Sequence, residues 1–180
     1  TINTTGYTIS GADAGNYTLT QPTLSADITA KELTITGLTG DDKEYDGATT
    51  ATATGTASLS GLITGDTVSL GGTPVFTFSS SNVGTGITIN TTGYTISGAD
   101  SGNYTLTQPT LSADITAKEL TITGLTGDDK VYDNTTSATA TGTASLSGLI
   151  TGDIVSLGGS PDFTFSSSNV GTGITINTTG

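Results

Sequence analysis

The sequence Asp-Asp-Lys-Glu-Tyr-Asp-Gly occupies residues 41–47 and returns as Asp-Asp-Lys-Val-Tyr-Asp-Asn at residues 128–134, a spacing of 87. Each copy combines several charged residues, one tyrosine and a Gly or Asn that favours turns. Alternating apolar and polar residues, which are typical of strands, flank both copies. The pattern predicts a turn near the start of a repeated β-module.

The 87-residue period extends over the whole chain. Thr1 matches Thr88 and Thr88 matches Thr175, so the 180 residues equal two periods plus six residues. The copies differ at eight positions, which are Ala14/Ser101, Glu44/Val131, Gly47/Asn134, Ala48/Thr135, Thr50/Ser137, Thr67/Ile154, Thr73/Ser160 and Val75/Asp162. Copies this similar indicate a recent duplication, so their identity alone says little about function.

The residues between the turns predict strands. A chain rich in Thr, Gly, Ser, Ile and Val favours strands over helices. Turn signals about every 8–12 residues divide each period into roughly seven or eight short strands. We expect a strand in residues 1–10 with Tyr7 and Ile9 facing inward, and another in which Tyr17 and Leu19 share a face. Residues 71–74, Gly-Gly-Thr-Pro, are expected to turn the chain.

One difference between the copies predicts which side chains face the core. Val75 becomes Asp162 beside an aromatic residue, and successive side chains of a strand point to opposite faces. Position 75 should therefore face solvent, while Phe76 points inward. The Thr67/Ile154 exchange, next to Val68, fits the same alternation.

These patterns predict an all-β fold of tandem, Ig-like β-sandwich modules of 87 residues, with a β-grasp-like fold or a β-solenoid as alternatives. A module of this length can bury a core without disulfides or metal. Solenoid coils take about 20–30 residues each, so an 87-residue period would need internal sub-repeats, which the sequence does not show.

Composition excludes several classes of protein. The net charge is −12 with only four basic residues, all Lys, so we expect no nucleic-acid partner. No run of 18 apolar residues occurs, so no membrane insertion is expected. The chain has no Cys and no His, which removes disulfides, thiolate zinc sites and the usual nucleophile–base pairs, and we expect no enzymatic activity.

The acidic stretch suggests a calcium site. Asp42, Glu44 and Asp46 alternate as in the start of an EF-hand loop. The candidate ligands of both copies are Asp41, Asp42, Asp46, Asp128, Asp129 and Asp133. Ala53 stands where a bidentate Glu is required, and Val131 removes the middle ligand of the second copy. The sequence therefore favours no metal or other cofactor.

A solvated turn is the interpretation that we favour for this stretch. Its Asp side chains would cap backbone N–H groups. Tyr45, or Tyr132 in the second copy, would anchor the turn to the module's core while the carboxylates face water.

Two further chemistries have weaker support. An isopeptide crosslink would join one of the four lysines (Lys31, Lys43, Lys118 and Lys130) to a partner such as Asn82, Asn103 or Asn169. The lysines lie at polar turns or module junctions, where a solvated lysine is the simpler interpretation, since a buried unpaired Lys is costly. Thr-x-Thr rows in residues 34–36 and 52–56 suggest ice or flat-surface binding, but Thr also favours the wet face of any strand.

The Tyr-Asp-Gly turn at residues 45–47 resembles the signature of the YDG-type repeat domains of large bacterial surface proteins and adhesins. Residues 65–68 (Gly-Asp-Thr-Val), 82–84 (Asn-Val-Gly) and 98–104 (Gly-Ala-Asp-Ser-Gly-Asn-Tyr) support the resemblance, which covers essentially the whole period. Asn134 replaces the Gly of the signature, and Asn also tolerates the left-handed conformation. The resemblance implies a secreted stalk or adhesive array, and it supplies no catalytic residues.

The family's frame divides the chain into three parts. Residues 33–119 form a complete module, residues 1–32 the C-terminal part of a preceding module, and residues 120–180 the N-terminal part of a following one. The two end parts are complementary and could complete each other between chains as a donor-strand filament. The same arithmetic follows if the segment belongs to one long polypeptide, which we favour.

The expected function is that of a structural repeat segment in a secreted bacterial adhesin, stalk or filament, located on the extracellular surface. Its expected partners are neighbouring repeats of the same chain or filament. Direct junctions at residues 30–33 and 117–120, without a Gly/Ser linker, predict a stiff rod. The alternative function is a ligand-binding adhesive module for a glycan, a surface or ice, assisted by calcium.

Overall fold

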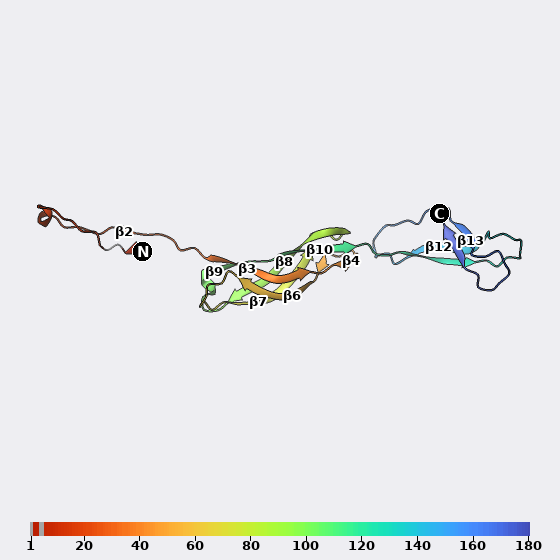
Figure 1. The fold of residues 1–180 in the computed structure, drawn as a ribbon, viewed down its shortest axis with the longest axis horizontal. Coiled ribbons are helices and arrows are strands. Elements are labelled where there is room, and N and C mark those ends of the chain that lie inside the picture. The colour runs from red at the N-terminus through yellow and green to blue at the C-terminus, as the bar shows by residue number, and fades with distance from the viewer. Residues whose placement is uncertain (1, 4–5) are drawn as a thin grey trace. The chain divides into compact units, whose positions relative to one another are not determined.

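A computed structural model describes residues 2–3 and 6–180 (Figure 1). The described residues form strands and two short 3-10 turns, and no α-helix occurs among them. The predicted all-β fold is therefore confirmed. The strands combine into separate sheets of two to five strands. No helix in the described part of the chain is long and apolar enough to cross a membrane.

The strands follow one another along the chain in short segments. They are β1 (Ile2–Asn3), β2 (Thr23–Leu24), β3 (Lys31–Gly40), β4 (Lys43–Glu44), β5 (Thr50–Ala51), β6 (Ala53–Ser60), β7 (Ser69–Phe78), β8 (Gly84–Ser97), β9 (Tyr104–Thr107), β10 (Thr110–Thr116), β11 (Thr121–Gly127), β12 (Ala140–Ser147), β13 (Asp162–Phe165) and β14 (Ile176–Thr179). The 3-10 turns are η1 (Ala14–Asn16) and η2 (Ser101–Asn103). Strands β3 to β10 occupy the first full period, which agrees with the expected seven or eight.

The chain divides into two compact units. Unit 1 comprises Thr1–Thr39, Thr54–Val75 and Thr91–Thr110. Unit 2 comprises Gly40–Ala53, Phe76–Asn90 and Leu111–Gly180. Strands β3, β7 and β8 contribute residues to both units.

Unit 1 is built around the sheet β6-β3-β9. Strand β3 pairs in parallel with β9, with Lys31 opposite Tyr104. Leu33 is fully buried, and Tyr104 is nearly so. The Tyr104 hydroxyl accepts a hydrogen bond from Ile63 N at 3.2 Å and donates one to the carboxylate of Asp66. A buried aromatic residue with a satisfied hydroxyl thus ties the turn after β6 to β9.

The prediction of a turn at residues 71–74 is wrong, because strand β7 continues through these residues from Ser69 to Phe78. Gly72 has φ 98°, and a Cβ there would lie 2.1 Å from the carbonyl oxygen of Gly93. Glycine in this strand permits the close approach of two backbones and does not end the strand.

Unit 2 contains the larger core. Phe78, Ile89 and Ile115 are almost fully buried, together with Ala51 and Ala113. The partly buried side chains packed against this cluster are Tyr45, Phe76, Ile87 and Leu111. Strand β10 pairs in parallel with β4, and β5 pairs antiparallel with β7. The core therefore joins strands that lie far apart in the sequence, from β5 to β10.

The predicted facing of β7 is confirmed. Phe76 packs against the core, whereas the neighbouring Val75 is 55% exposed. In the second copy Asp162 is exposed and Phe163 is partly buried. The exchange of Val for Asp is tolerated because position 75 faces water in both copies.

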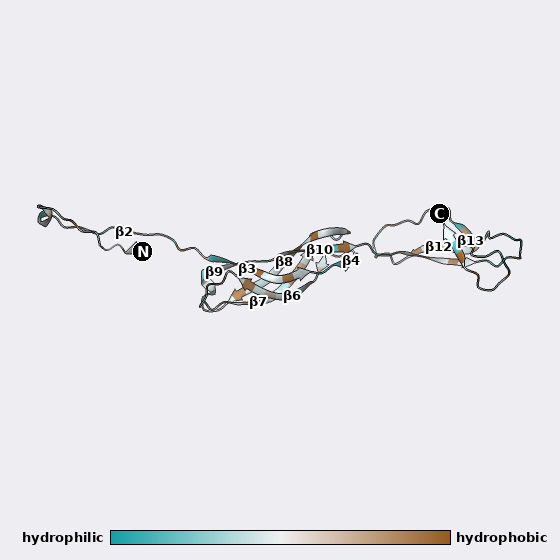
Figure 2. Cartoon of the chain, viewed as in Figure 1, coloured by the Kyte–Doolittle hydropathy of each residue, from teal (hydrophilic) through white to brown (hydrophobic). Residues whose placement is uncertain are grey.

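Residues 120–180 form two hairpin-like pairs, β11 with β12 and β13 with β14. Figure 2 shows apolar residues on the strands of both copies. Burial differs between the copies although the residues are the same: Ile35 is 7% exposed and its counterpart Ile122 is 57% exposed. The counterparts of residues 94–119 would follow residue 180, so β9 and β10 have no equivalents among the described residues of the second copy.

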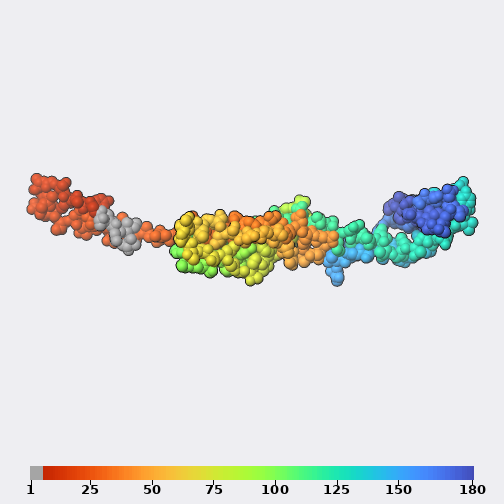
Figure 3. Space-filling model, turned by 60° about the horizontal axis from the view of Figure 1, so that its bottom comes forward, coloured from red at the N-terminus to blue at the C-terminus, as the bar shows by residue number. Residues whose placement is uncertain are grey.

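Of the strand expected in residues 1–10, the described part contains only β1 at Ile2–Asn3, and the strand expected around Tyr17 and Leu19 does not form. Residues 6–20 contain no strand, and the expected inward residues Tyr7 and Tyr17 are 64% and 72% exposed. Residues 6–32 form a narrow stretch of chain (Figure 3). Strands need partners to bury their apolar face, and residues 1–32 alone do not supply them.

Candidate functional site

The first copy of the repeated acidic stretch folds around a lysine. Lys43 lies in β4, and its Nζ donates hydrogen bonds to Asp46 Oδ1 at 2.6 Å, Ala48 O at 2.8 Å and Thr50 O at 3.2 Å. Its side chain is only 18% exposed, and Nζ lies 5.8 Å from the centroid of the Phe78 ring. We call residues 43–50 the first lysine-centred turn.

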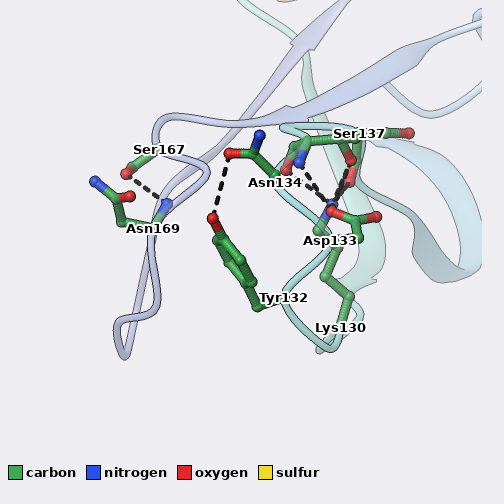
Figure 4. A network of polar contacts seen from close by, with 8 residues as sticks. Lys130, Tyr132, Asp133, Asn134, Ser137, Ser167 and Asn169 are labelled. Carbon is green, nitrogen blue, oxygen red and sulfur yellow. Dashed lines mark hydrogen bonds and ion pairs between the residues drawn. The ribbon is translucent and has the colours of Figure 1, made fainter.

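The second copy repeats this arrangement around Lys130 (Figure 4). Its Nζ donates to Asp133 Oδ1 at 2.8 Å, to Thr135 O at 2.9 Å and to Ser137 O at 3.0 Å. The ring of Phe165 lies at the same 5.8 Å as its counterpart. Residues 130–137 are the second lysine-centred turn.

The Asp of each turn also shapes the backbone, as the sequence predicts. Asp46 Oδ1 accepts a hydrogen bond from Ala48 N, and Asp133 Oδ1 accepts one from Thr135 N, both at 2.9 Å. The residue after Asp adopts the left-handed conformation, with φ 78° at Gly47 and φ 61° at Asn134. Gly and Asn are the residues that accept this conformation at low cost.

The lysines lower the pKa values of the two carboxyl groups. The ammonium of Lys43, followed by the N–H of Ala48, holds the pKa of Asp46 below its ordinary value. Lys130 and the N–H and hydroxyl of Thr135 lower the pKa of Asp133 to about 2. The exchange of Ala48 for Thr135 adds a hydroxyl that bonds both Lys130 and Asp133 at 2.8 Å.

The calcium ligands suggested by the sequence are not brought together. Asp46 and Asp133 bind lysine, and Asp42 Oδ1 accepts a hydrogen bond from Asp114 N at 2.7 Å. Asp41 and Asp128 bond through their backbone N–H groups to Thr52 O and Thr139 O, and Asp129 is exposed. Among residues 2–3 and 6–180, no three Asp or Glu side chains are placed to hold a metal ion. The cation at the centre of each turn is an ammonium.

In the described part of the chain, no asparagine is a hydrogen-bond partner of a lysine side chain. Lys43 and Lys130 bond carboxylate, carbonyl and hydroxyl oxygens, and Lys118 Nζ donates to Glu44 Oε1 at 2.7 Å. A lysine ammonium has three donors, and Lys43 uses them on three different residues. Such a group stabilises a turn and is not poised for an isopeptide bond.

The tyrosine of the turn behaves differently in the two copies. Tyr45 packs against the core of unit 2, which confirms the predicted anchor. Tyr132 is 56% exposed, and its hydroxyl donates a hydrogen bond to Asn134 Oδ1 at 3.3 Å (Figure 4). The prediction that this tyrosine anchors the turn to a core is therefore wrong for the second copy. Tyr45 packs beside a cluster that includes Ile115, and residues 120–180 contain no counterpart of that strand.

The first turn also contacts the second copy. A methyl group of Ile150 lies 3.2 Å from the position that a Cβ on Gly47 would occupy. The Asp153 carboxylate, as hydrogen-bond acceptor and nearby charge, raises the pKa of Tyr45. Residues 150–153 form the turn equivalent to residues 63–66 of the first copy, so this contact joins successive modules.

The central role of lysine was not found from the sequence. One signal for it was present. Four of the eight differences between the copies fall at positions 44, 47, 48 and 50, yet the Lys and Asp of the turn are unchanged. A Lys-x-x-Asp spacing that survives this local variation points to a specific pair.

Replacing Lys43 with methionine is expected to lower the free energy of unfolding by about 1–3 kcal/mol, because three oxygen acceptors lose a charged donor. Lys118→Met is the matched control. The Lys118–Glu44 pair is more exposed, at 32% and 56% for the two side chains, so its loss should cost less than about 1 kcal/mol. Urea titrations followed by the amide resonances of residues 43–51 measure both. Equal losses would contradict the central role of Lys43.

Acid is expected to destabilise both turns. A carboxyl group whose pKa is depressed in the folded state stabilises that state above its unfolded pKa, and loses this effect as the pH falls through the folded value. For Asp133 the window runs from its ordinary 3.8 down to about 2. The urea midpoint should fall across this range, and Asp133→Asn should remove part of that slope. An unchanged slope in Asp133→Asn would contradict the assignment.

The pattern of the YDG domain matches residues 29–111 and again residues 116–180, with starting points 87 residues apart. No curated protein and no solved structure matches the chain. The two matches together cover more than half of the 180 residues, and each includes one lysine-centred turn with its Tyr-Asp pair. The chain belongs to the YDG domain family.

Proposed function

We propose that the chain is a structural repeat segment of a secreted bacterial surface protein, in which tandem modules form a stalk or filament that gives reach and rigidity. The observation that carries this proposal is the direct succession of two YDG domain matches. Strand β10 ends at Thr116 and β11 begins at Thr121, so only four residues separate the strands of successive modules.

Contacts across this junction support rigidity. Lys118, in the junction segment between β10 and β11, pairs with Glu44 of the first copy at 2.7 Å and so holds the junction segment against that copy. Ile150 of the second copy lies against Gly47 of the first, as described above. In a repeat array, such contacts between neighbours set the stiffness of the whole. The partners in this proposal are therefore the neighbouring repeats of the same chain or filament.

The composition supports an extended array in water. Sixteen acidic residues stand against four lysines, and like charges disfavour collapse and edge-to-edge pairing of strands. The proposal includes no catalytic activity, metal or cofactor, and it places the array outside the cell. The family resemblance and the repeat architecture together support the proposed display on a surface.

Small-angle scattering on chains of two, three and four 87-residue periods tests the mechanical part of the proposal. The largest dimension is expected to rise in proportion to the number of periods. The same chains in concentrated urea are the control, since unfolded chains grow with about the 0.6 power of length. Random-coil scaling in buffer without urea would overturn the proposal.

A further inference from the structure

Residues 150–153 of the second copy, which we call the docking turn, lie against the first lysine-centred turn. Both turns belong to unit 2. A methyl group of Ile150 lies 3.2 Å from the position that a Cβ on Gly47 would occupy. The Asp153 carboxylate, as hydrogen-bond acceptor, raises the pKa of Tyr45. One apolar and one polar side chain of the docking turn therefore meet the Tyr-Asp-Gly turn of the preceding module.

The contact changes the burial of the isoleucine. Ile150 is partly buried, whereas its counterpart Ile63 is 51% exposed. Residues 61–66 and 148–153 have the same sequence. In the described part of the chain no Tyr-Asp-Gly turn precedes Ile63, and the first copy is the more completely packed of the two. Burial within the module alone would therefore favour Ile63, and the contact with the first lysine-centred turn accounts for the difference.

The complete module shows that this turn is held in place before it meets a neighbour. Asp66 N donates a hydrogen bond to Ile63 O at 3.2 Å, and the equivalent bond from Asp153 N to Ile150 O is 3.0 Å long. The Tyr104 hydroxyl accepts a hydrogen bond from Ile63 N and donates one to Asp66. A carboxylate can accept several hydrogen bonds, so it can serve its own module and a neighbour. Preformed structure lowers the entropic cost of the contact.

The junction segment makes a small contact sufficient. Four residues separate β10 from β11, and one of them, Lys118, is held by Glu44 at 2.7 Å. A short tether turns the meeting of two surfaces into an intramolecular event, with an effective concentration of about millimolar. The docking turn therefore does not need the large interface that free partners require.

Position 47 decides how closely the isoleucine can approach. Gly47 has φ 78°, and its counterpart Asn134 has φ 61°, so both residues keep the left-handed backbone of the turn. A Cβ at position 47 would lie 3.2 Å from the methyl group of Ile150, whereas carbon atoms in contact usually lie about 3.5–4.0 Å apart. The remaining atoms of an Asn side chain need further room. Gly and Asn are therefore equivalent for the fold of the turn and different for its contact with Ile150.

We propose that the docking turn of one module binds the lysine-centred turn of the module before it, and that Gly at position 47 permits this locked joint whereas Asn weakens it. The partner is thus the next module of the same chain. The inference rests on the proposed function, in which tandem modules form a stalk, and it names the surface through which they hold one another.

The differences between the copies support a role of this surface in setting stiffness. Glu44, which holds Lys118, is replaced by Val131, and Gly47 is replaced by Asn134. Two of the eight differences therefore fall on residues that hold the junction, while the lysine and aspartate of the turn stay the same. An array built of both kinds of turn contains stiffer and looser joints without a change in the modules themselves.

Nuclear Overhauser effects in the 180-residue chain test the contact itself. A cross-peak is expected between the methyl groups of Ile150 and the α-protons of Gly47. The methyl groups of Ile63 are the internal control and should give no cross-peak to Tyr45 or Gly47. Absence of the cross-peak from Ile150 would overturn the proposal.

Amide ¹⁵N relaxation tests whether the contact locks the joint. Strands β8 and β11 of the unmodified chain should show one rotational correlation time. Gly47→Asn should separate the two values and remove the Ile150 cross-peak. Its fold is safe because the second copy already carries Asn at this position. The control Gly86→Asn has a similar φ of 58° and nothing within 4 Å of its Cβ position, so it should leave a single value.

Substitution of the docking turn provides an independent check. Ile150→Asp should separate the correlation times as Gly47→Asn does. The control Ile154→Asp makes the same exchange at a residue that is 96% exposed and should leave a single value. Two correlation times in the unmodified chain, or a single value in both Gly47→Asn and Ile150→Asp, would overturn the proposal.

The joint and the stalk can fail separately. Size that rises in proportion to the number of periods, without the cross-peak from Ile150, would overturn the joint and leave the stalk intact. Random-coil scaling of longer arrays, with the cross-peak present in the 180-residue chain, would overturn the stalk and leave the contact between two modules.

Discussion

Replacing Phe78 with alanine is expected to lower the free energy of unfolding by about 3–5 kcal/mol, the usual cost of deleting a fully buried phenylalanine. Phe78 is 2% exposed and packs with Ile89 and Ile115 in the core of unit 2. Removal of its ring leaves a cavity that the surrounding strands cannot fill. Urea titration followed by the amide resonances of residues 76–90 measures the loss.

Phe165→Ala is the matched control, because Phe165 is the same residue in the second copy. It is only partly buried, so its replacement should cost clearly less. Equal losses at the two positions would contradict the difference in packing between the copies.

Replacing Gly37 with alanine is expected to destabilise unit 1 strongly. Gly37 has φ 87°, a conformation that costs about 1–3 kcal/mol for other residues. A Cβ would also lie 2.2 Å from Thr56 O, and one on the facing Gly55 would lie 2.1 Å from Gly37 O. The two strands β3 and β6 are thus too close at this point for any side chain.

Gly65→Ala separates the effect of backbone strain from the effect of the steric clash. Gly65 has φ 102°, but nothing lies within 4 Å of the position of its Cβ. Its replacement should cost only the strain of the backbone, whereas Gly37→Ala adds the clash. Hydrogen exchange of residues 33–39 should rise in Gly37→Ala and change little in Gly65→Ala. A similar rise in both variants would show that the clash is relieved without loss of structure.

The sequence predicted the features that depend on local pattern. The period, the all-β fold, the facing of Val75 and Phe76, and the tolerance of Asn134 at a left-handed position all follow from residue type and spacing. Each depends on neighbours along the chain or on the alternation of a strand. These signals lie within short stretches of sequence, so both copies of the repeat carry them.

The predictions that failed depend on partners far along the chain. Tyr7 has the same immediate neighbours in sequence as Tyr94, and Tyr132 shares most of its neighbours with Tyr45, yet Tyr7 and Tyr132 are exposed. The pattern of apolar residues states which face is buried, but not whether a covering strand is present. Two identical stretches therefore differ in burial.

The prediction for the two lysine-centred turns was incomplete for another reason, because it gave the lysine no role in the turn. Charges that alternate along a short stretch suggest a site for a metal ion, and the polar surroundings of Lys43 and Lys130 predict solvated side chains. The structure folds each lysine back onto its own turn, over Phe78 or Phe165. A long side chain with three donors can supply the cation of an acidic loop from within the chain.

The claim that the chain is a series of separately folded 87-residue modules is tested most directly by pulling single molecules of several periods. Each module should unfold in its own step, and all steps should have equal length. Fully extended, 87 residues span about 290–310 Å, so each step should fall somewhat below this value. Extension without discrete steps, or one step that grows with the number of periods, would contradict the claim.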